Sequence, residues 1–354
     1  MGCALGKEDR RRRMSHFRVE RRLRHDQQSR EKEVKILMLG AGESGKSTVL
    51  KQLKLVNGGG YSADERWYFK GVIFANIIQS MQAVLEAMDV LGIPFSNPAS
   101  DRHASAVLSQ RQKMTAAELS PEVNHAIKAL WADAGVKTCL SRCNEFQVSD
   151  SARYYFDSID RISSPNFVPD DQDILRSRQK TTGVAEFAFT SNKDTIYRVI
   201  DVGGQRSERK KWMHHFEDVN LILFLVALSE YDQMLYEDGS VNRLQEAINL
   251  FRDVCESRWF THSTVQLVFN KTDLFREKLS HSTLEAFFPD YEGGSDYDAA
   301  SQYISDKFKS PNQARLPDFF ICATDTAQIK TLMGRIVDTM GKRSGPAASE
   351  NARP

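Results

Sequence analysis

The chain has 354 residues, of which 41% are hydrophobic and 27% charged, as in an ordinary soluble globular protein with room for about two domains. A net charge of +1 excludes a bulk attraction to nucleic acid, so any basic surface is local. The five cysteines show no metal-ligand or disulfide spacing, the N-terminus is charged, and no apolar stretch reaches transmembrane length, which together predict a cytosol-side protein.

Residues 1–33 form a basic N-terminal segment. Residues 7 to 32 contain eleven Lys or Arg against five Asp or Glu, and neither Pro nor Gly. This composition predicts a solvated helix without an apolar stripe. Such a helix buries little by itself, so we expect it to need a partner or a surface to hold it.

A complete phosphate-binding loop comes next. The apolar run Val34–Leu39 predicts a buried strand, and Thr48–Leu55 predicts the helix that follows. Between them, glycines let backbone N–H groups fold around a polyphosphate at a helix N-terminus. Lys46 supplies a positive charge, and the Ser47 hydroxyl is placed to bind Mg²⁺. The predicted phosphate-binding residues are Gly40, Ala41, Gly42, Glu43, Ser44, Gly45, Lys46, Ser47 and Thr48.

Residues 61–176 are predicted to form an all-helical insertion. Apolar residues from Phe74 to Leu91 recur at three- and four-residue steps, which indicates a long amphipathic helix. Ser120 and Pro121 are typical of a helix start, and a further helical pattern runs from Asp150 to Ile162. Nothing between residues 61 and 165 resembles a strand.

Strand patterns resume in residues 177–340. Val184–Thr190 and Thr195–Asp201 flank a short polar turn and predict a hairpin. Further short strands, separated by helical segments, are predicted at Leu221–Ala227, Val265–Phe269 and Phe319–Cys322. With residues 34–60, this alternation predicts an α/β fold with a mostly parallel sheet, interrupted by the helical insertion.

The strand at Val265–Phe269 is followed by a motif that can read a base. Asn270, Lys271 and Asp273 lie where ligands bind in open α/β sheets. The Asp273 carboxylate can accept hydrogen bonds from the N1 and N2 donors of guanine. Adenine lacks this donor pair and would leave the carboxylate unpaired at a cost of about 1–3 kcal/mol, which disfavours a P-loop ATPase or kinase. A backbone N–H that can reach the base oxygen is offered by Cys322, Ala323 and Thr324.

A second motif closes the hairpin strand. Asp201 can hold the hydration shell of Mg²⁺, while Gly203 and Gly204 let the backbone approach the γ-phosphate. Gln205 can then orient the attacking water. The polar segment 173–183 links the insertion to the sheet, and the predicted fold brings two of its residues near the phosphates.

Those two residues are Arg178 and Thr181. Thr181 would complete the Mg²⁺ ligands with Ser47, and Arg178 would supply positive charge to the transition state.

Together these residues resemble the alpha subunits of heterotrimeric G proteins, from residue 34 to about residue 340. The resemblance rests on Gly40–Ser47, Leu175–Arg178, Lys180–Gly183, Asp201–Trp212, Asn270–Asp273 and Cys322–Thr326. It implies a Ras-like GTPase domain with a helical lid over GTP or GDP, and an ion pair between Glu43 and Arg178. The built-in arginine and the water-orienting glutamine are established features of this family. Further implied nucleotide-binding residues are Asp150, Ser151, Leu175, Arg176 and Ser177.

The resemblance also implies partners and a location. The segment Gly203–Phe216 would bind a βγ dimer in the GDP state and effectors in the GTP state. A receptor or other exchange factor, a GTPase-activating regulator and the cytoplasmic face of the plasma membrane complete the implied partners. The start Met1-Gly2-Cys3 matches the lipidated start of the family, so we predict myristoylation of Gly2 and palmitoylation of Cys3 beside the basic helix.

The chain departs from the family pattern at four places. Gln179 stands where a small apolar residue is usual, His215 replaces a cysteine, and Gly6 stands where myristoylation favours Ser or Thr. Residues 341–354 are hydrophilic, contain Pro346 and are predicted to be disordered, whereas the family ends in a tail that receptors grip. The leading prediction is a membrane-associated, GTP-hydrolysing switch. The alternative is a nucleotide- and βγ-binding subunit that is uncoupled from receptors.

Overall fold

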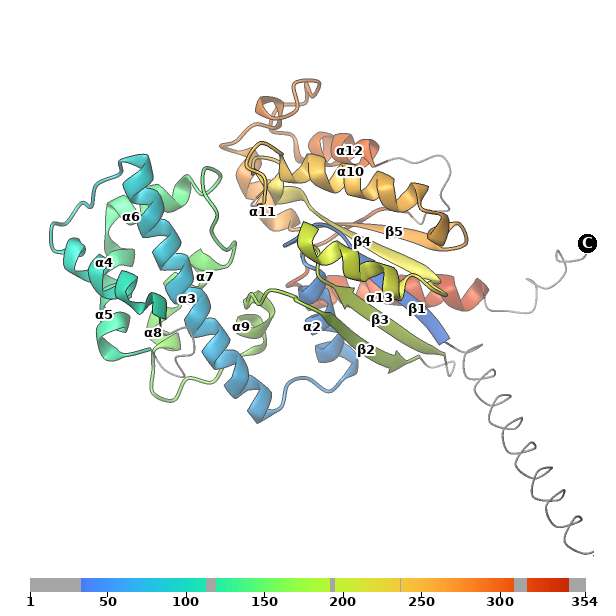
Figure 1. Cartoon of the computed structure of the whole chain (residues 1–354), viewed down its shortest axis with the longest axis horizontal. Helices are drawn as coiled ribbons and strands as arrows, with labels where there is room; N and C mark the ends of the chain where they lie inside the picture. Colours follow the sequence, from blue (N-terminus) through green and yellow to red (C-terminus); the bar gives the residue numbers. More distant parts are fainter. Residues whose placement is uncertain (1–32, 113–118, 192–194, 236, 309–316, 344–354) are drawn as a thin grey trace, which may run out of the picture.

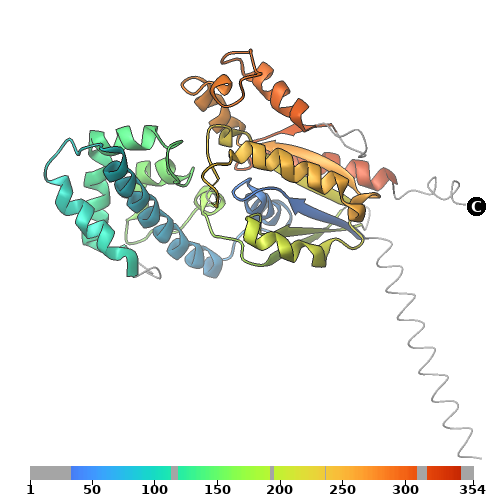
Figure 2. The ribbon, with the colours of Figure 1, turned by 45° about the horizontal axis from the view of Figure 1, so that its top comes forward.

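The chain folds into a sheet region and a helical region that lie side by side (Figures 1 and 2). The computed structural model describes residues 33–112, 119–191, 195–235, 237–308 and 317–343. The predicted N-terminal helix up to residue 32 and the tail from residue 344 lie outside the described residues.

A six-stranded sheet in the order β2-β3-β1-β4-β5-β6 forms the centre of one region. Its strands are β1 (Glu33–Leu39), β2 (Val184–Thr190), β3 (Ile196–Val202), β4 (Leu221–Ala227), β5 (Thr264–Asn270) and β6 (Phe319–Phe320). The predicted hairpin is present as the antiparallel pair β2 and β3, and the other neighbours are parallel. This confirms the predicted α/β fold with a mostly parallel sheet.

Helices cover both faces of this sheet. On one face, alternate residues of β1 such as Ile36 and Met38 pack against α2 (Lys46–Asn57) and α13 (Thr326–Arg343). On the other face, Leu37 and Leu39 belong to a second core with α10 (Arg243–Glu256) and α12 (Tyr297–Lys307). All seven residues of β4 and of β5 are buried, as expected for central parallel strands that are covered on both sides.

The helical region has a core of its own. Its helices are α3 (Ala63–Leu91), α4 (Ser100–Leu108), α5 (Pro121–Ala132), α6 (Ala134–Ser141), α7 (Ala152–Asp157), α8 (Ile159–Ile162) and α9 (Asp171–Arg176). Among the described residues between 61 and 165 there is no strand. Ser120 caps α5 by accepting a hydrogen bond from the Val123 N–H, and Ser62 and Glu65 form a capping box at the start of α3. Elsewhere the described chain has α11 (Thr272–Leu279) and the 3₁₀ segments η1 (Ser109–Gln112), η2 (Arg206–His215), η3 (Leu228–Glu230), η4 (Arg258–Phe260) and η5 (Leu284–Ala286).

Helix α3 differs from one expectation of the sequence analysis. By length and composition alone it is long and apolar enough to cross a membrane. In the structure, 56% of its most apolar window is buried, and residues such as Ile77 and Val84 form the core of the helical region. The apolar run is therefore explained by packing against α6 and α7.

Several element boundaries also differ from the predictions, by one or two residues in most strands and in α2. The pattern at Asp150–Ile162 is broken at Ser158 into α7 and α8. Strand β6 ends at Phe320 and not at Cys322, because the Cys322 N–H donates to the Gln328 side chain and leaves the sheet ladder. Helix α13 continues to Arg343 where we expected it to fade by Met340, since the buried Met340 holds its last turn against the core.

A buried carboxylate organises the far end of the helical region. Asp133 caps α6 and accepts hydrogen bonds from the backbone N–H groups of Ser96, Asn97 and Gly135 and from the Ser100 hydroxyl, at 2.8 to 3.0 Å. Burial opposes its ionisation. The hydrogen bonds from Ser96, Asn97 and Ser100 nevertheless hold the pKa of Asp133 far below its usual range.

We expect Asp133→Ala to lower the free energy of unfolding by roughly 2–4 kcal/mol, because buried donors lose their acceptor and α6 loses its cap. A carboxylate with a depressed folded-state pKa stabilises the protein above its unfolded pKa of about 3.9 and loses this contribution as the pH falls. The difference between parent and variant in urea unfolding should therefore shrink below about pH 4. Asp101→Ala, an exposed change on α4, is the control. If Asp133→Ala lowers the free energy of unfolding no more than Asp101→Ala does, then the Asp133 carboxylate does not stabilise the helical region as described.

Candidate active site

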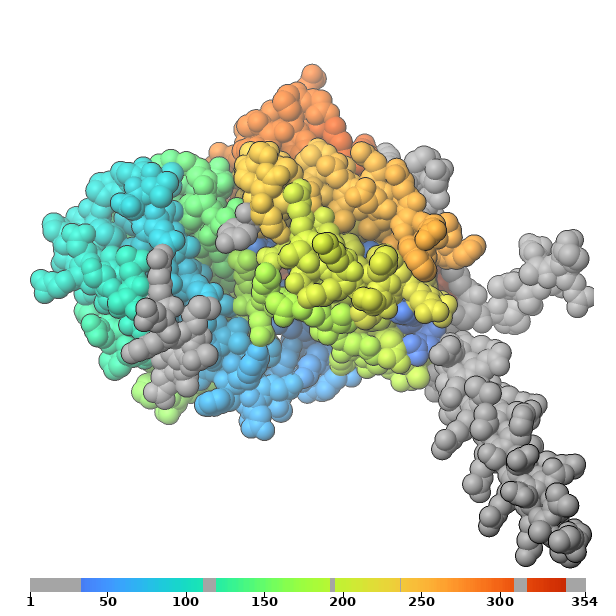
Figure 3. All heavy atoms as spheres, viewed as in Figure 1, coloured from blue at the N-terminus to red at the C-terminus, as the bar shows by residue number. Residues whose placement is uncertain are grey.

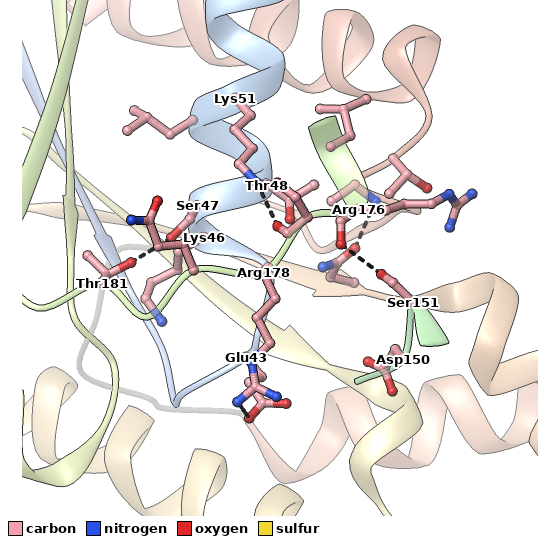
Figure 4. Close-up of a pocket in the computed structure, with 18 of the residues that line it drawn as sticks. Glu43, Lys46, Ser47, Thr48, Lys51, Asp150, Ser151, Arg176, Arg178 and Thr181 are labelled. Carbon is pink, nitrogen blue, oxygen red and sulfur yellow. Dashed lines mark hydrogen bonds and ion pairs between the residues drawn. The ribbon is translucent and has the colours of Figure 1, made fainter. Parts of the chain in front are cut away.

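A cleft of about 460 Å³ lies where the helical region meets the sheet region. Figure 3 shows the two regions in contact along one boundary. The phosphate-binding loop and α2 contribute one wall, and residues 149–151 of the helical region contribute another. The segment 175–181 and the loops after β5 and β6 complete the lining. Several of these residues are drawn in Figure 4.

The side chain of Asn270 holds the phosphate-binding loop in place. Asn270, the last residue of β5, donates from Nδ2 to the Ser44 carbonyl at 2.9 Å and accepts at Oδ1 from the Ala323 N–H at 2.8 Å. Gly45 adopts a left-handed conformation with φ of 100° and lies so close to the Asn270 amide that a Cβ would overlap it. The loop at the start of α2 is thereby joined to the loop that precedes α13.

Three oxygen-bearing side chains converge beside this loop. The Ser47 hydroxyl donates to Asp201 Oδ2 at 2.6 Å and lies 2.9 Å from the Thr181 hydroxyl oxygen. Asp201 Oδ1 is buried without a hydrogen-bond partner, and burial raises the pKa of Asp201. Two hydroxyls and one carboxylate with an unsatisfied oxygen fit a small hard cation that keeps part of its water shell, such as Mg²⁺.

Lys46 lies next to these oxygens. Its ammonium group donates to the carbonyl oxygens of Gly40 at 3.0 Å and Ala41 at 2.7 Å. Burial lowers the pKa of Lys46 to about 8, although the negative charge of Asp201 partly offsets this effect. A Cβ on Gly204 would overlap the backbone carbonyl oxygens of Gly40 and Ala41 as well as the Lys46 ammonium, so only glycine lets the chain after β3 approach the loop this closely.

Arg178 extends into the cleft from the segment that links the two regions (Figure 4). Its guanidinium pairs with Glu43 at 2.5 Å, which is the ion pair that the resemblance implies. Burial alone would raise the pKa of Glu43, but Arg243 and Arg178 outweigh burial and hold this pKa below its usual range. Gln205 also lines the cleft, and its Cγ lies 3.3 Å from the place that a Cβ on Gly42 would occupy.

Ion pairs run along the cleft and join the two regions. Lys271, at the start of α11, pairs with Asp150 of the helical region at 2.5 Å and with the buried Glu230 at 2.8 Å. Arg243 pairs in turn with Glu230 at 3.3 Å and with Glu43 at 3.1 Å. Burial lowers the pKa of Lys271, but Asp150 and Glu230 outweigh it and leave this pKa raised. Positive and negative side chains therefore alternate along this network of ion pairs, from Asp150 in the helical region to Glu43 in the phosphate-binding loop.

The loops after β5 and β6 form another part of the cleft wall. Asp273 is exposed there at the start of α11. The Ala323 carbonyl accepts from Gln52 of α2 at 3.0 Å, and the Cys322 thiol lies 3.1 Å from the Thr324 hydroxyl. Burial raises the pKa of Cys322, so its thiol stays protonated near neutral pH.

A loop that carries an exposed carboxylate, a glycine-rich loop and a cluster of two hydroxyls and one carboxylate thus share one cleft between the helical region and the sheet region. A family model described as the G-protein alpha subunit matches residues 14–340. The chain belongs to this family. As a G-protein alpha subunit, it is a GTPase that binds GTP and GDP and acts in heterotrimeric G-protein signalling. Members of the family generally work with a βγ dimer and receptors and associate with membranes.

Three relatives are similar along nearly the whole chain. A G-protein complex alpha subunit of Aspergillus fumigatus and a guanine nucleotide-binding protein alpha-1 subunit of Neurospora crassa are each 51% identical over 341 residues. A guanine nucleotide-binding protein alpha subunit of Pyricularia oryzae is 50% identical over 341 residues. Each match covers 96% of this chain and 96% of the relative.

The structure brings most of the sequence-predicted site residues of this alpha subunit together in the cleft. Four of the predicted nucleotide-binding residues are buried and do not line it: Gly40, Ala41, Ser44 and Gly203. The predicted lipidation sites Gly2 and Cys3 lie outside the described residues. The lining also contains residues that we did not predict: Leu50, Lys51, Phe69, Ser149, Gln179, Lys180, Ala185 and Leu274.

Lys51 is the missed residue with the clearest signal. It follows Ser47 by one turn of α2, and its ammonium donates to the Ser177 carbonyl at 2.7 Å and to the Ser177 hydroxyl at 2.9 Å. The four-residue spacing from Ser47 could have placed it on the same helix face. Phe69 of α3 gave no such signal, because only the tertiary fold brings α3 to the cleft.

Proposed function

We propose that the cleft binds a guanine nucleotide with Mg²⁺ and that Arg178 and Gln205 carry its hydrolysis. The observation that supports this most directly is the cluster of Ser47, Thr181 and Asp201 oxygens, with its unsatisfied buried atom, beside the Lys46 ammonium. A Mg²⁺ ion bound there would neutralise charge on the β- and γ-phosphates.

The two ends of the nucleotide would be read by different loops. The backbone N–H groups of the phosphate-binding loop and Lys46 would hold the phosphates at the start of α2. The Asp273 carboxylate would accept from guanine N1 and N2, and a backbone N–H of residues 322–324 would donate to the base oxygen. We propose the remaining predicted nucleotide contacts on the same grounds, including Asp150 and Ser151 at the helical side.

Hydrolysis would depend on two side chains at the γ-phosphate end. Gln205 would hold the attacking water in line, while the Arg178 guanidinium would stabilise the charge that develops in the transition state. The Arg178 side chain is 47% exposed at the cleft, and it would have to exchange its ion pair with Glu43 for a contact with a phosphate. This chemistry needs positioning and charge more than covalent help.

The test is nucleotide exchange and single-turnover GTP hydrolysis on the purified full chain, with Mg²⁺ and with EDTA. We expect tight GTP binding that competes with GDP and not with ATP, and hydrolysis that stops when EDTA is added. GTP hydrolysis at the same rate in EDTA would contradict the proposed metal site. Equal competition by ATP would contradict the base recognition.

We also propose the domain boundaries that the sequence predicts. Residues 34–60 and 177–340 would form the Ras-like GTPase domain, and residues 61–176 the helical domain. The separate cores of the two regions support this division. The predicted basic helix would end at residue 32 and not at residue 33, because Glu33 already belongs to β1, and the tail would begin after Arg343, where α13 ends.

The segment Gly203–Phe216 is the proposed partner surface. Its helix η2 leaves Met213 62% exposed, while Trp212 is buried and donates to the Gly203 carbonyl at 2.7 Å. A partner bound to η2 would therefore contact an element that is hydrogen-bonded to Gly203, which is followed by the cleft residues Gly204 and Gln205. We propose a βγ dimer there in the GDP state, effectors and a GTPase-activating regulator in the GTP state, and no nucleic acid.

We propose that the N-terminus anchors the alpha subunit to the cytoplasmic face of the plasma membrane through acylated Gly2 and Cys3. In cell fractionation, Cys3→Ser should move the protein from the membrane to the soluble fraction. The shift should be larger at high salt, which screens the basic segment. Cys143→Ser, a half-buried thiol of the helical region, is the control. An unchanged membrane fraction would show that Gly2 acylation or a βγ dimer is sufficient.

A second candidate function, a subunit uncoupled from receptors, is favoured by the tail. The family model ends its match at residue 340, and residues 345–354 contain no large apolar residue. We expect deletion of residues 345–354 to leave GTP binding, hydrolysis and receptor-stimulated exchange unchanged. A selective loss of receptor-stimulated exchange would show that this tail couples to a receptor.

A further inference from the structure

Helix α3 of the helical region contacts the backbone of Arg178. The Asn76 side chain donates from Nδ2 to the Arg178 carbonyl at 2.8 Å and accepts at Oδ1 from the Arg178 N–H at 2.7 Å. Asn76 is only 8% exposed. A buried carboxamide thus pairs with both polar groups of one residue and fixes the direction of its backbone.

The next residue is held by the same helix. Gln179 donates from Nε2 to the Tyr68 hydroxyl at 2.7 Å. Tyr68 lies eight residues before Asn76 on α3, which corresponds to about 12 Å along the helix axis. Both residues of this pair are exposed, so the contact is weaker than the buried one.

The segment that carries these residues has little regular structure of its own. Residues 177–182 form neither helix nor strand, and the side chains of Lys51 and Lys211 donate to the Ser177 and Thr182 carbonyls. A long arginine side chain on such a segment reaches a defined point only if its backbone is fixed. Asn76 satisfies the polar groups of Arg178 itself, which no helix or strand hydrogen bond does.

We propose that Asn76 and Tyr68 are positioning residues that make α3 hold Arg178 in the cleft, so that arginine placement depends on the helical lid. This rests on the proposed catalytic role of Arg178. Gln179 stands where the family usually has a small apolar residue. Through its hydrogen bond to Tyr68 it adds a second attachment between α3 and the segment that carries Arg178.

The main test uses single-turnover hydrolysis with GTP already bound. Asn76→Ala should slow hydrolysis about tenfold or more, because a small misplacement of a catalytic group is costly. On an Arg178→Cys background, Asn76→Ala should add no further slowing, since the group that it positions is already absent. Ser80→Ala, one turn later on α3 and equally buried, is the matched control and should hydrolyse at the parent rate.

Two results would overturn the inference. One is a parental rate for Asn76→Ala. The other is equal slowing by Asn76→Ala on both backgrounds, which would indicate general damage to the fold. If Arg178→Cys itself hydrolyses GTP at the parent rate, then the proposed function of Arg178 has failed, and this outcome is distinguishable from failure of the inference.

A second variant covers the case in which Asn76→Ala does not fold. Tyr68→Phe removes one exposed hydroxyl and keeps the ring, so it should fold normally. We expect hydrolysis to slow about two- to fivefold, which is the loss of one exposed hydrogen bond, and again only when Arg178 is present. Trp67→Phe at the neighbouring exposed position is its control. If Tyr68→Phe hydrolyses GTP at the parent rate, then the Gln179–Tyr68 contact does not help to position Arg178.

Discussion

Gln205→Leu is expected to bind GTP as the parent does and to lose nearly all hydrolysis. Gln205 lines the cleft between Gly42 and the start of η2, where its amide can hold a water molecule against a γ-phosphate. Leucine has similar volume but no polar group, so water positioning is lost while the binding surface remains. We expect single-turnover hydrolysis to slow at least about 100-fold, the range of a lost proton-handling or water-orienting group.

Arg178→Cys should slow hydrolysis in the same way, by roughly 10³–10⁵-fold, which is the established contribution of an arginine to this chemistry. Gln245→Leu, the same substitution at an exposed position of α10, is the control for the glutamine variant. Near-parental hydrolysis by either site variant would contradict the role assigned to that residue. A large loss of GTP binding would show that the variant disturbs the cleft itself.

Asp273→Asn is expected to reverse the choice of base. An amide cannot accept from both N1 and N2 of guanine, but it can accept from N1 and donate to the oxygen that xanthine carries in place of the amino group. The lost hydrogen bond to a charged acceptor is worth about 1.5–3 kcal/mol, so GTP affinity should fall roughly 10- to 150-fold.

Xanthosine triphosphate should bind the Asp273→Asn variant better than GTP does. Competition against a fluorescent GDP analogue measures both affinities. Asp298→Asn, an exposed change on α12, controls for the loss of one negative charge. A variant that retains parental GTP affinity would show that the Asp273 carboxylate does not read the base.

The sequence was most informative where one short segment contains a complete function. The phosphate-binding loop was recognisable because its glycines, Lys46 and Ser47 lie between a strand and a helix. The hairpin of β2 and β3 was visible for the same reason, since a polar turn separates two strand patterns. By contrast, the break at Ser158 and the early end of β6 depend on contacts that no local pattern carries.

Some contacts that hold the site in place, such as those of Asn76 and Asn270, could not be predicted from the sequence. Asn76 and Arg178 are separated by 102 positions, and only the tertiary fold brings them together. Asn270 was predicted as a nucleotide contact, yet its amide joins the backbone at Ser44 to that at Ala323. Motif spacing indicates which residues face a ligand. It carries no information about the side chains behind them.

Because Asn270 joins two loops of the cleft, we expect the alpha subunit to bind the base and the phosphates of a nucleotide cooperatively. One carboxamide bonds to Ser44 of the predicted phosphate-binding loop and to Ala323 of the loop proposed to contact the base, so order in one loop should favour order in the other. A nucleoside without phosphates, or a polyphosphate without a base, engages one half of a structure whose two halves share a support. Each fragment should therefore bind more weakly than its own contacts suggest, and discrimination against fragments is a property of the scaffold as well as of the contact residues.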